Sequence, residues 1–193
     1  MWDEMSDEAL MLAYRDGDAA AFEALYRRWR GRLYRYLLRQ CGSAAHADEL
    51  FQDIWLKIVG ARKGYEVAAK FSTWLFRIAH NRLIDHYRAQ GRAAIVSLVS
   101  YDDDPEDADR VAALPAAAVT QPEVMIERKA LAQELVKHIE ALPAAQRETF
   151  LLSEEGELTL EEIAVATGVN RETAKSRLRY ALNKLRAALK EVR

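Results

Sequence analysis

The sequence predicts an all-α fold, made of two small helical domains joined by a flexible acidic linker. Glycine and proline are scarce, with eight and four among 193 residues, and the charged residues are mostly helix formers. Apolar residues recur at helical spacing in two parts of the chain. Between these parts, residues 97–120 lack a sustained period and carry six acidic residues from Asp102 to Asp109, a composition typical of a linker. The expected first domain, linker and second domain are residues 1–92, 93–121 and 122–193.

Capping residues predict four helices in the first domain. The residues expected to begin or end the first three are Ser6, Gly17, Asp18, Gly42 and Ser43. The third helix is expected to continue to about Val59, and residues 60–70 then form a loop. Ser72 or Thr73 is expected to open the fourth helix.

Helical periodicity returns after Pro122. Pro143 is expected at the first position of the next helix, which Gly156 closes. A capping box then opens a short helix, a glycine turn ends it, and an N-capped long helix follows. The residues that mark this last segment are Thr159 with Glu162, Gly168 and Asn170.

A short helix, a turn and a long amphipathic helix form the helix-turn-helix pattern. The apolar residues that share the inner face of the long helix are Ala174, Leu178, Ala181, Leu182 and Leu185. The opposite stripe and its flanks hold side chains suited to base edges and phosphates, namely Glu172, Thr173, Lys175, Ser176, Arg179, Tyr180 and Asn183. A plain helical hairpin with a solvated polar face is the alternative; the cap, the turn and the basic stripe together favour DNA binding.

The third helix presents a second candidate surface. Its inner residues are Ala47, Leu50, Phe51, Ile54 and Ile58. Leu56 projects the other way, among Glu49, Gln52 and Asp53. A single exposed leucine is ordinary. With three polar neighbours at docking distance, it becomes a candidate for binding a partner.

The fourth helix, residues 71–88, separates into two faces. The packing side holds Leu75, Phe76, Ala79, Leu83 and Tyr87, and the other side holds Trp74, Arg77, Asn81, Asp85 and Arg88. An aromatic ring among arginines and an amide is a composition that stacks on unpaired bases and hydrogen-bonds them. The equally weighted alternative is that Trp74 covers the edge of the core near the helix start.

Six arginines in the second helix form a further basic cluster, which indicates a solvated helix face with some contact to phosphate. They are Arg27, Arg28, Arg30, Arg32, Arg35 and Arg39. The net charge of −2 does not itself indicate a nucleic-acid binder, so that role requires local segregation of charge.

Other classes of function find no support in the sequence. The four histidines and the single cysteine, Cys41, lack metal-ligand spacing, and no catalytic or phosphate-loop motif occurs, so no metal, cofactor or catalytic residue is expected. The single cysteine suits a reducing compartment. The N-terminus lacks a hydrophobic signal core, and no apolar run is long enough to span a bilayer. We therefore expect a cytoplasmic protein that is not inserted in a membrane.

Four stretches resemble bacterial RNA polymerase sigma factors of the extracytoplasmic-function (ECF) type. DAAAFEALYRRWRGRLYRYLLR, ADELFQDIWLKIV and FSTWLFRIAHNRLIDHYR, residues 18–39, 47–59 and 71–88, resemble sigma region two. Residues 141–186, from ALPAAQRETF to YALNKLR, resemble sigma region four. The two regions stand in the family's order without a region three, and the likeness covers nearly the whole chain.

The resemblance implies an initiation subunit that binds core RNA polymerase and directs it to promoters. The residues implied for binding core polymerase are Glu49, Gln52, Asp53 and Leu56. Those implied for the minus-ten element are Lys70, Phe71, Ser72, Trp74, Arg77, Asn81 and Arg88. Those implied for the minus-thirty-five element are Arg171, Thr173, Lys175, Ser176, Arg179 and Tyr180. The linker resembles the segment that passes through the polymerase cleft.

The implied partners are core RNA polymerase, promoter DNA and an anti-sigma factor, which in this family is often anchored in the membrane. Two alternatives remain open at the level of sequence. A conventional helix-turn-helix regulator would bind specific duplex DNA without polymerase, and an adaptor would bind polymerase without melting DNA. Transcription with purified core enzyme separates them.

Overall fold

The computed structural model describes residues 2–91 and 122–191. Within these ranges it contains eight α-helices, two short 3-10 helices and no strand, in agreement with the all-α prediction. The elements are η1 (Trp2–Glu4), α1 (Asp7–Arg15), α2 (Ala19–Cys41), α3 (Ala44–Ala61), η2 (Arg62–Gly64), α4 (Phe71–Ala89), α6 (Pro122–Ala141), α7 (Ala144–Glu154), α8 (Leu160–Thr167) and α9 (Arg171–Glu191). The predicted linker, residues 93–121, lies outside the described residues, and the domain boundaries stay predictions.

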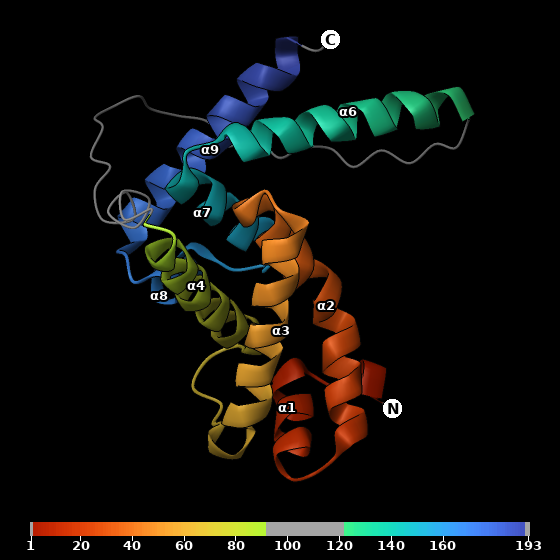
Figure 1. The fold of residues 1–193 in the computed structure, drawn as a ribbon, viewed down its shortest axis with the longest axis vertical. Coiled ribbons are helices and arrows are strands. Elements are labelled where there is room, and N and C mark those ends of the chain that lie inside the picture. The colour runs from red at the N-terminus through yellow and green to blue at the C-terminus, as the bar shows by residue number, and fades with distance from the viewer. Residues whose placement is uncertain (1, 92–121, 192–193) are drawn as a thin grey trace.

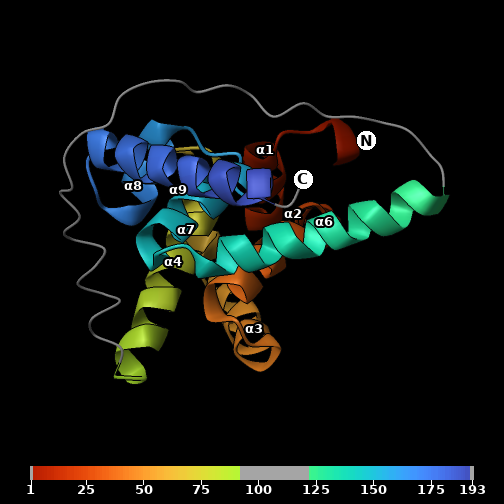
Figure 2. The same ribbon diagram turned by 90° about the horizontal axis from the view of Figure 1, so that it is seen from above.

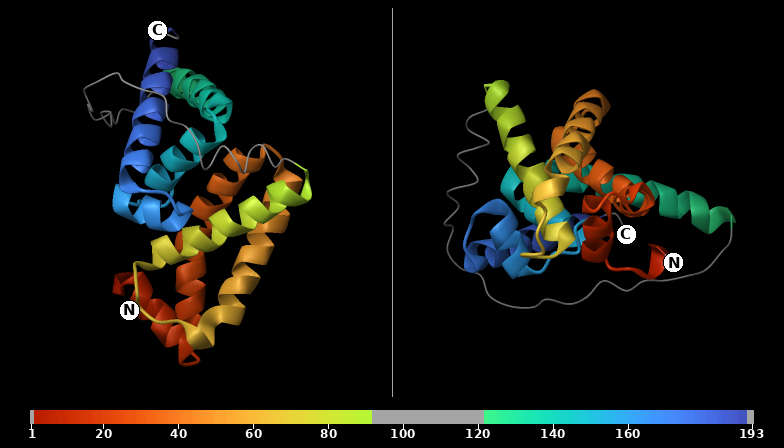
Figure 3. Two further views of the ribbon diagram at one scale, coloured as in Figure 1. Left: turned by 90° about the vertical axis from the view of Figure 1, so that its left-hand side faces the viewer. Right: turned by 90° about the horizontal axis from the view of Figure 1, so that it is seen from below.

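Helices α1 to α4 form one bundle, in the lower half of Figure 1. α2 packs against both α1 and α3, and α4 runs across them, as the left view of Figure 3 shows. Among the fully buried side chains of this core are Leu10, Met11, Leu25, Leu33, Leu37, Leu50, Ile54, Ile58 and Leu75. Each apolar stripe predicted for the third and fourth helices therefore faces this core, although Phe51 is only partly buried.

Helices α6 to α9 form the second group; in Figure 1, α6 and α9 reach the top of the molecule, and α8 lies lower, beside α4. α7 and α8 both pack on α9, whose inner residues Ala174 and Ala181 are fully buried. The turn at Gly168 has the left-handed φ of 72° that glycine tolerates best. The helix-turn-helix predicted from the sequence is present.

The predicted caps are mostly confirmed. The Ser6 and Asp18 side chains accept hydrogen bonds from the first turns of α1 and α2, and Asn170 Oδ1 accepts one from the Thr173 N–H at 2.7 Å. Thr159 and Glu162 form the reciprocal capping box of α8. These contacts are local, so the residue types at each spacing suffice to predict them.

Two predicted helix starts are wrong by one or two residues. α4 begins at Phe71, before Ser72 and Thr73, because its first N–H finds a distant acceptor: Phe71 N–H donates to Glu8 Oε1 of α1 at 2.7 Å. Pro143 occupies the N-cap of α7, not its first helical position. Its extended ψ of 142° turns the chain before the helix starts.

The two groups of helices pack against one another. α7 and α6 contact α2, and α8 lies against α4. Viewed from above in Figure 2, α6 and α9 extend over the bundle of α1 to α4. Gly156 follows α7 and lies close to the first bundle. A Cβ at this position would be 3.1 Å from Phe76 Cδ2 of α4 and 2.6 Å from the carbonyl oxygen of Leu152 in α7 itself. Gly156 is therefore required for this close approach.

Candidate protein and nucleic-acid interfaces

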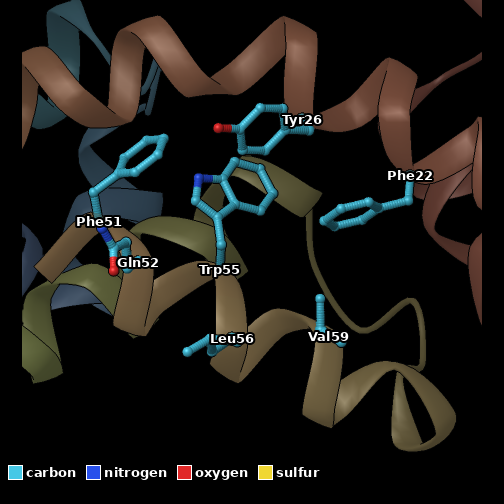
Figure 4. Close-up of a pocket in the computed structure, with 7 residues that line it drawn as sticks. All are labelled: Phe22, Tyr26, Phe51, Gln52, Trp55, Leu56 and Val59. Carbon is cyan, nitrogen blue, oxygen red and sulfur yellow. The ribbon is translucent and has the colours of Figure 1, made fainter. Parts of the chain in front are cut away.

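An open apolar groove of about 410 Å³ lies between α2 and α3 (Figure 4). Its lining residues are Phe22, Tyr26, Phe51, Gln52, Trp55, Leu56 and Val59. Tyr26 and Phe22 pack on the Trp55 ring at centroid distances of 4.9 and 5.7 Å, which fixes the aromatic floor. Leu56 is 67% exposed and Val59 39% exposed at the rim. An apolar, aromatic-lined concavity of this kind is suited to an apolar side chain of a partner.

The four residues predicted to bind core polymerase fall into two pairs. Gln52 and Leu56 line the groove. Asp53 and Glu49 instead lie beside Arg82 of α4, with carboxylate-to-guanidinium distances of 2.7 and 3.6 Å. Asp53, beside the groove, is therefore held in an ion pair with Arg82.

Five groove residues were not predicted for this surface, and one of them, Phe51, was expected to face the core. The five are Phe22, Tyr26, Phe51, Trp55 and Val59. Phe22 with Tyr26, and Trp55 with Val59, each stand four residues apart on one helix. This spacing was a visible signal. The groove itself requires knowledge of how α2 faces α3.

The start of α4 is largely covered in the structure. Phe71 is fully buried and Ser72 is 7% exposed. Lys70 is exposed, but its ammonium lies 3.0 Å from a carboxylate oxygen of Glu162 in α8. All three residues are predicted to bind minus-ten DNA. Phe71 and Ser72 are buried, and Lys70 contacts the second group of helices.

Trp74 is half-buried and packs at the edge of the core. Its ring meets Tyr65 at 5.1 Å and Phe71 at 5.9 Å between centroids. In this arrangement Trp74 therefore covers the edge of the core, which is the alternative interpretation given for it from the sequence. Tyr65 is itself buried, and burial raises its pKa to about 12, with the nearby Glu8 and Asp7 charges acting in the same direction.

The remaining predicted residues of α4 form an exposed face. Arg77, Asn81 and Arg88 are all exposed. Arg88 lies 3.8 Å from Asp85, a weak surface pair that leaves the guanidinium available to a phosphate. This face has the cations and the amide that contact with nucleic acid requires.

The outer stripe of α9 is held by local contacts. Arg171 pairs with Glu161 of α8 and with Glu172, while Lys175 lies 3.7 Å from Glu172. Glu161 holds Arg171 in its charged state: the hydrogen bond and then the carboxylate charge raise the arginine's pKa. Arg171 and Lys175 are exposed, and Thr173 is partly so.

The other predicted residues of α9 are partly buried. The Ser176 hydroxyl donates to the Glu172 carbonyl oxygen at 2.9 Å. Arg179 lies over the Tyr180 ring, 5.2 Å from its centroid. All six residues predicted for the minus-thirty-five element therefore share one region of α9, with Arg171 and Lys175 the most accessible.

A buried polar cluster, unanticipated from the sequence, joins the two groups of helices. The Tyr36 hydroxyl donates to Glu148 Oε1 at 2.9 Å, and His80 Nδ1 lies 2.7 Å from the same oxygen. The three side chains come from α2, α7 and α4 and are 0%, 5% and 6% exposed. Burial opposes the charge on His80, but the charge and hydrogen bond of Glu148 raise the pKa of His80.

The same contacts act on Glu148 in the opposite direction. Its burial disfavours the carboxylate, yet the charge of His80, hydrogen bonds from His80 and Tyr36, and the charge of Arg177 lower its pKa. Tyr36 has a pKa well above its ordinary value because it is buried beside this carboxylate. These directions favour the charged forms of His80 and Glu148 and the neutral form of Tyr36.

Three of the six clustered arginines pair with glutamates of the second group of helices. Arg35 makes a bidentate contact with Glu155, at 2.8 and 2.7 Å. Arg39 lies 3.2 Å from Glu140. Arg32 pairs with Glu157. This helix face is therefore solvated only in part: Arg35 stays exposed, whereas Arg32 and Arg39 are half-buried.

Neither a metal site nor a membrane-spanning helix occurs within residues 2–91 and 122–191. No group of three or more His, Cys, Asp or Glu side chains there is arranged to hold a metal ion. No helix in those ranges is long and apolar enough to cross a membrane. Burial raises the pKa of the Cys41 thiol to about 11, against the opposing charge of Arg147, so this thiol is protonated at neutral pH.

Residues 25–93 match the family model "Sigma-70 region 2", and residues 138–187 match "Sigma-70, region 4". The chain is 31% identical over 190 residues to the ECF RNA polymerase sigma factor SigE of Mycolicibacterium smegmatis, covering 96% of this chain and 70% of that protein. It is 32% identical over 181 residues to the ECF RNA polymerase sigma factor RpoE of Cereibacter sphaeroides, covering 92% of each.

Two solved structures share the fold. CnrH, in complex with the cytosolic domain of CnrY, has a TM-score of 0.63 at 20% identity, covering 97% of this chain and 99% of that chain. The sigma factor RpoE of Bartonella quintana, in complex with the anti-sigma factor NepR, has a TM-score of 0.63 at 24% identity, covering 89% and 98%. Two sigma regions in family order, and relatives aligned over nearly the full chain, lead to one conclusion: the chain belongs to the ECF RNA polymerase sigma factors.

Proposed function

We propose that this sigma factor binds core RNA polymerase through the groove between α2 and α3 and directs it to promoters. The observation that carries the proposal is the open, aromatic-floored groove with Leu56 at its rim. An exposed apolar concavity bordered by charged side chains is typical of a protein-binding surface. Its position coincides with the residues that the family resemblance implies for polymerase.

The DNA-facing part of the proposal assigns two helices. Arg77, Asn81 and Arg88 on α4 contact the opened minus-ten region, and the accessible stripe of α9 with Arg171 and Lys175 contacts the minus-thirty-five element. Exposure and positive charge support both assignments. Phe71 and Ser72 are buried, and Phe71 packs on Trp29 and Trp74 within the first bundle, so these two residues are not among the exposed ones assigned to DNA.

We further propose that the chain acts in the cytoplasm, has no catalytic activity of its own and is controlled by an anti-sigma factor. Support for the control comes from the sigma factor RpoE, which was solved with the anti-sigma factor NepR. A membrane anchor on that partner is an expectation from the family alone. Purification of the tagged chain from its native cell, followed by mass spectrometry, should recover one stoichiometric partner besides polymerase. Recovery of polymerase alone would contradict anti-sigma control.

Run-off transcription tests the main proposal. Purified core enzyme and the chain are combined on a library of promoter fragments from the native genome, and transcripts are sequenced. The expected result is a set of start sites that depend on the chain and share upstream elements. Specific duplex binding without any chain-dependent transcript would instead identify a conventional helix-turn-helix regulator.

A further inference from the structure

The ion pairs that cross the contact between the two groups of helices share one polarity, although one cation of the second group, Arg147 of α7, also crosses it and donates to Gln40 Oε1 of α2 at 3.2 Å. Five ion pairs cross the contact, and each has its cation on the α1–α4 side and its carboxylate on the α6–α9 side. They are Arg32–Glu157, Arg35–Glu155, Arg39–Glu140, Lys70–Glu162 and His80–Glu148. Complementary charges across an interface oppose incorrect orientations of the two groups of helices and favour one relative placement. They therefore contribute to specificity as well as to affinity.

At the centre of the contact, Glu148 meets two side chains of the α1–α4 side. Its Oε1 accepts from Tyr36 of α2 and pairs with His80 of α4, all three being buried. A buried carboxylate without such partners is strongly unfavourable. Close packing of Gly156 on Phe76 adds shape complementarity beside this cluster. The contact is therefore specific.

This contact engages Lys70, a residue at the start of α4 that the family resemblance implies for minus-ten DNA. α8 lies against α4 (Figure 1). Glu162 of α8 lies 3.0 Å from the ammonium of Lys70. Lys70 is one of the residues expected to meet the DNA backbone at the minus-ten region. A carboxylate of the chain's own second domain thus stands where a phosphate oxygen would bind.

We propose that the α6–α9 domain locks the α1–α4 domain in the free chain, with Glu148 as its buried latch and Glu162 in the place of a DNA phosphate. Promoter binding then requires the two domains to part. The proposal that Glu162 occupies the place of a DNA phosphate rests on the proposed function, whereas the contact between the two domains does not.

A charge exchange tests the closed contact in the full chain. Energy transfer is measured between dyes on Glu23→Cys and Lys184→Cys in a Cys41→Ser background, sites that are exposed on α2 and α9. Arg35→Glu and Glu155→Arg should each lower transfer, because each puts like charges face to face. The double variant should restore the transfer of the parent chain. Arg30→Glu, the same change at an exposed position of α2, is the matched control and should leave transfer unchanged.

Two outcomes would overturn the lock. One is unchanged transfer in both single variants, and the other is a double variant that stays as open as the singles. Circular dichroism of each variant confirms that the helices are intact, so a fall in transfer reports separation of the domains and not unfolding.

The masking of DNA-binding residues is tested with Glu148→Gln. The probe is a fluorescent single-stranded DNA of mixed sequence, and the matched control is Glu154→Gln, the same change on the exposed side of α7. Loss of the latch should strengthen binding by about tenfold, since apparent affinity rises with the open fraction. Equal affinities of the two variants would overturn masking. A confirmed lock in a chain that yields no transcript with core enzyme would refute the proposed function and leave the closed contact standing.

Discussion

His80 and Glu148 respond to pH in opposite directions, and both responses favour the closed contact near neutrality. Glu148 raises the pKa of His80, so below the ordinary histidine pKa the full contribution of His80 to closure is present. That contribution is lost as pH rises through the raised pKa. The lowered pKa of Glu148 acts at the acidic end, where its contribution is lost as pH falls through that value. Tyr36, whose pKa is high, and Tyr87 also lie near this carboxylate, and the charge of Arg177 lowers the pKa of both His80 and Glu148.

We predict that the domains part as the solution becomes alkaline. Energy transfer between the two domains, followed from about pH 6 to pH 9, should fall as His80 loses its proton. His80→Gln should abolish this response. His46→Gln, which removes an imidazole outside the domain contact, should preserve it. A wild-type response that survives in His80→Gln would assign the titration to another group.

Gly156 gives a second prediction at this scale. A Cβ at position 156 would lie 2.6 Å from the Leu152 carbonyl oxygen and 3.1 Å from Phe76 Cδ2, so neighbouring atoms must move. Gly156→Ala should lower the free energy of unfolding by about 1–3 kcal/mol, measured by urea denaturation.

Gly60→Ala is the matched control for Gly156→Ala. Gly60 lies within α3 with no atom within 4 Å of an added Cβ. Alanine is the better helix former, so this change should raise the free energy of unfolding by about 0.5–1 kcal/mol. Similar changes in the free energy of unfolding of both variants would mean that the close contacts at Gly156 do not exclude a larger side chain there.

At the scale of elements, the predictions that succeeded depend on neighbouring residues. Ser6, Asp18 and Asn170 cap the helix that directly follows each of them. The start of α4 was misplaced because Glu8, distant in sequence, accepts its first N–H. A helix wheel likewise separates the faces of α2 and α3 but does not reveal the groove, since its walls come from both helices.

The groove between α2 and α3 carries the prediction at this scale. Leu56→Asp should weaken the affinity for core polymerase by at least about tenfold, because a carboxylate would be buried against the apolar partner. Competition with a labelled sigma factor on core enzyme measures the affinity. Val165→Asp is the control, because Val165 is 58% exposed on α8, outside the groove. Because Leu56 is exposed, stability should change little. Equal loss in both variants would place the polymerase contact elsewhere.

At the scale of the whole molecule, the sequence predicted the two groups of helices but not their contact. Arg32, Arg35 and Arg39 follow helical spacing on α2, a pattern equally typical of a solvated face. Their glutamate partners are more than a hundred residues away in the chain. Such pairings depend on how the domains dock, which helical periodicity within one element does not encode.

The assignment of the two DNA-facing helices predicts separable defects in transcription. Asn81→Ala should impair promoter opening, detected by permanganate reactivity of unpaired thymines, and leave closed-complex formation largely intact. Lys175→Ala should instead weaken recruitment to the upstream element by about 1–3 kcal/mol if a base contact is lost. Both side chains are exposed, so each variant should fold normally. Normal opening in Asn81→Ala would remove that residue from the proposed minus-ten face.

The row formed by Arg32, Arg35 and Arg39 has a consequence for how the chain meets a polyanion. While each guanidinium faces a glutamate, the charges of the pair largely cancel, so the row presents little net positive charge. When the domains part, the row and Lys70 lose their glutamate partners together. Each cation that then neutralises a duplex phosphate adds about 0.9 to the salt slope of binding. The molecule can thus alter its electrostatic character through shape alone, at constant composition.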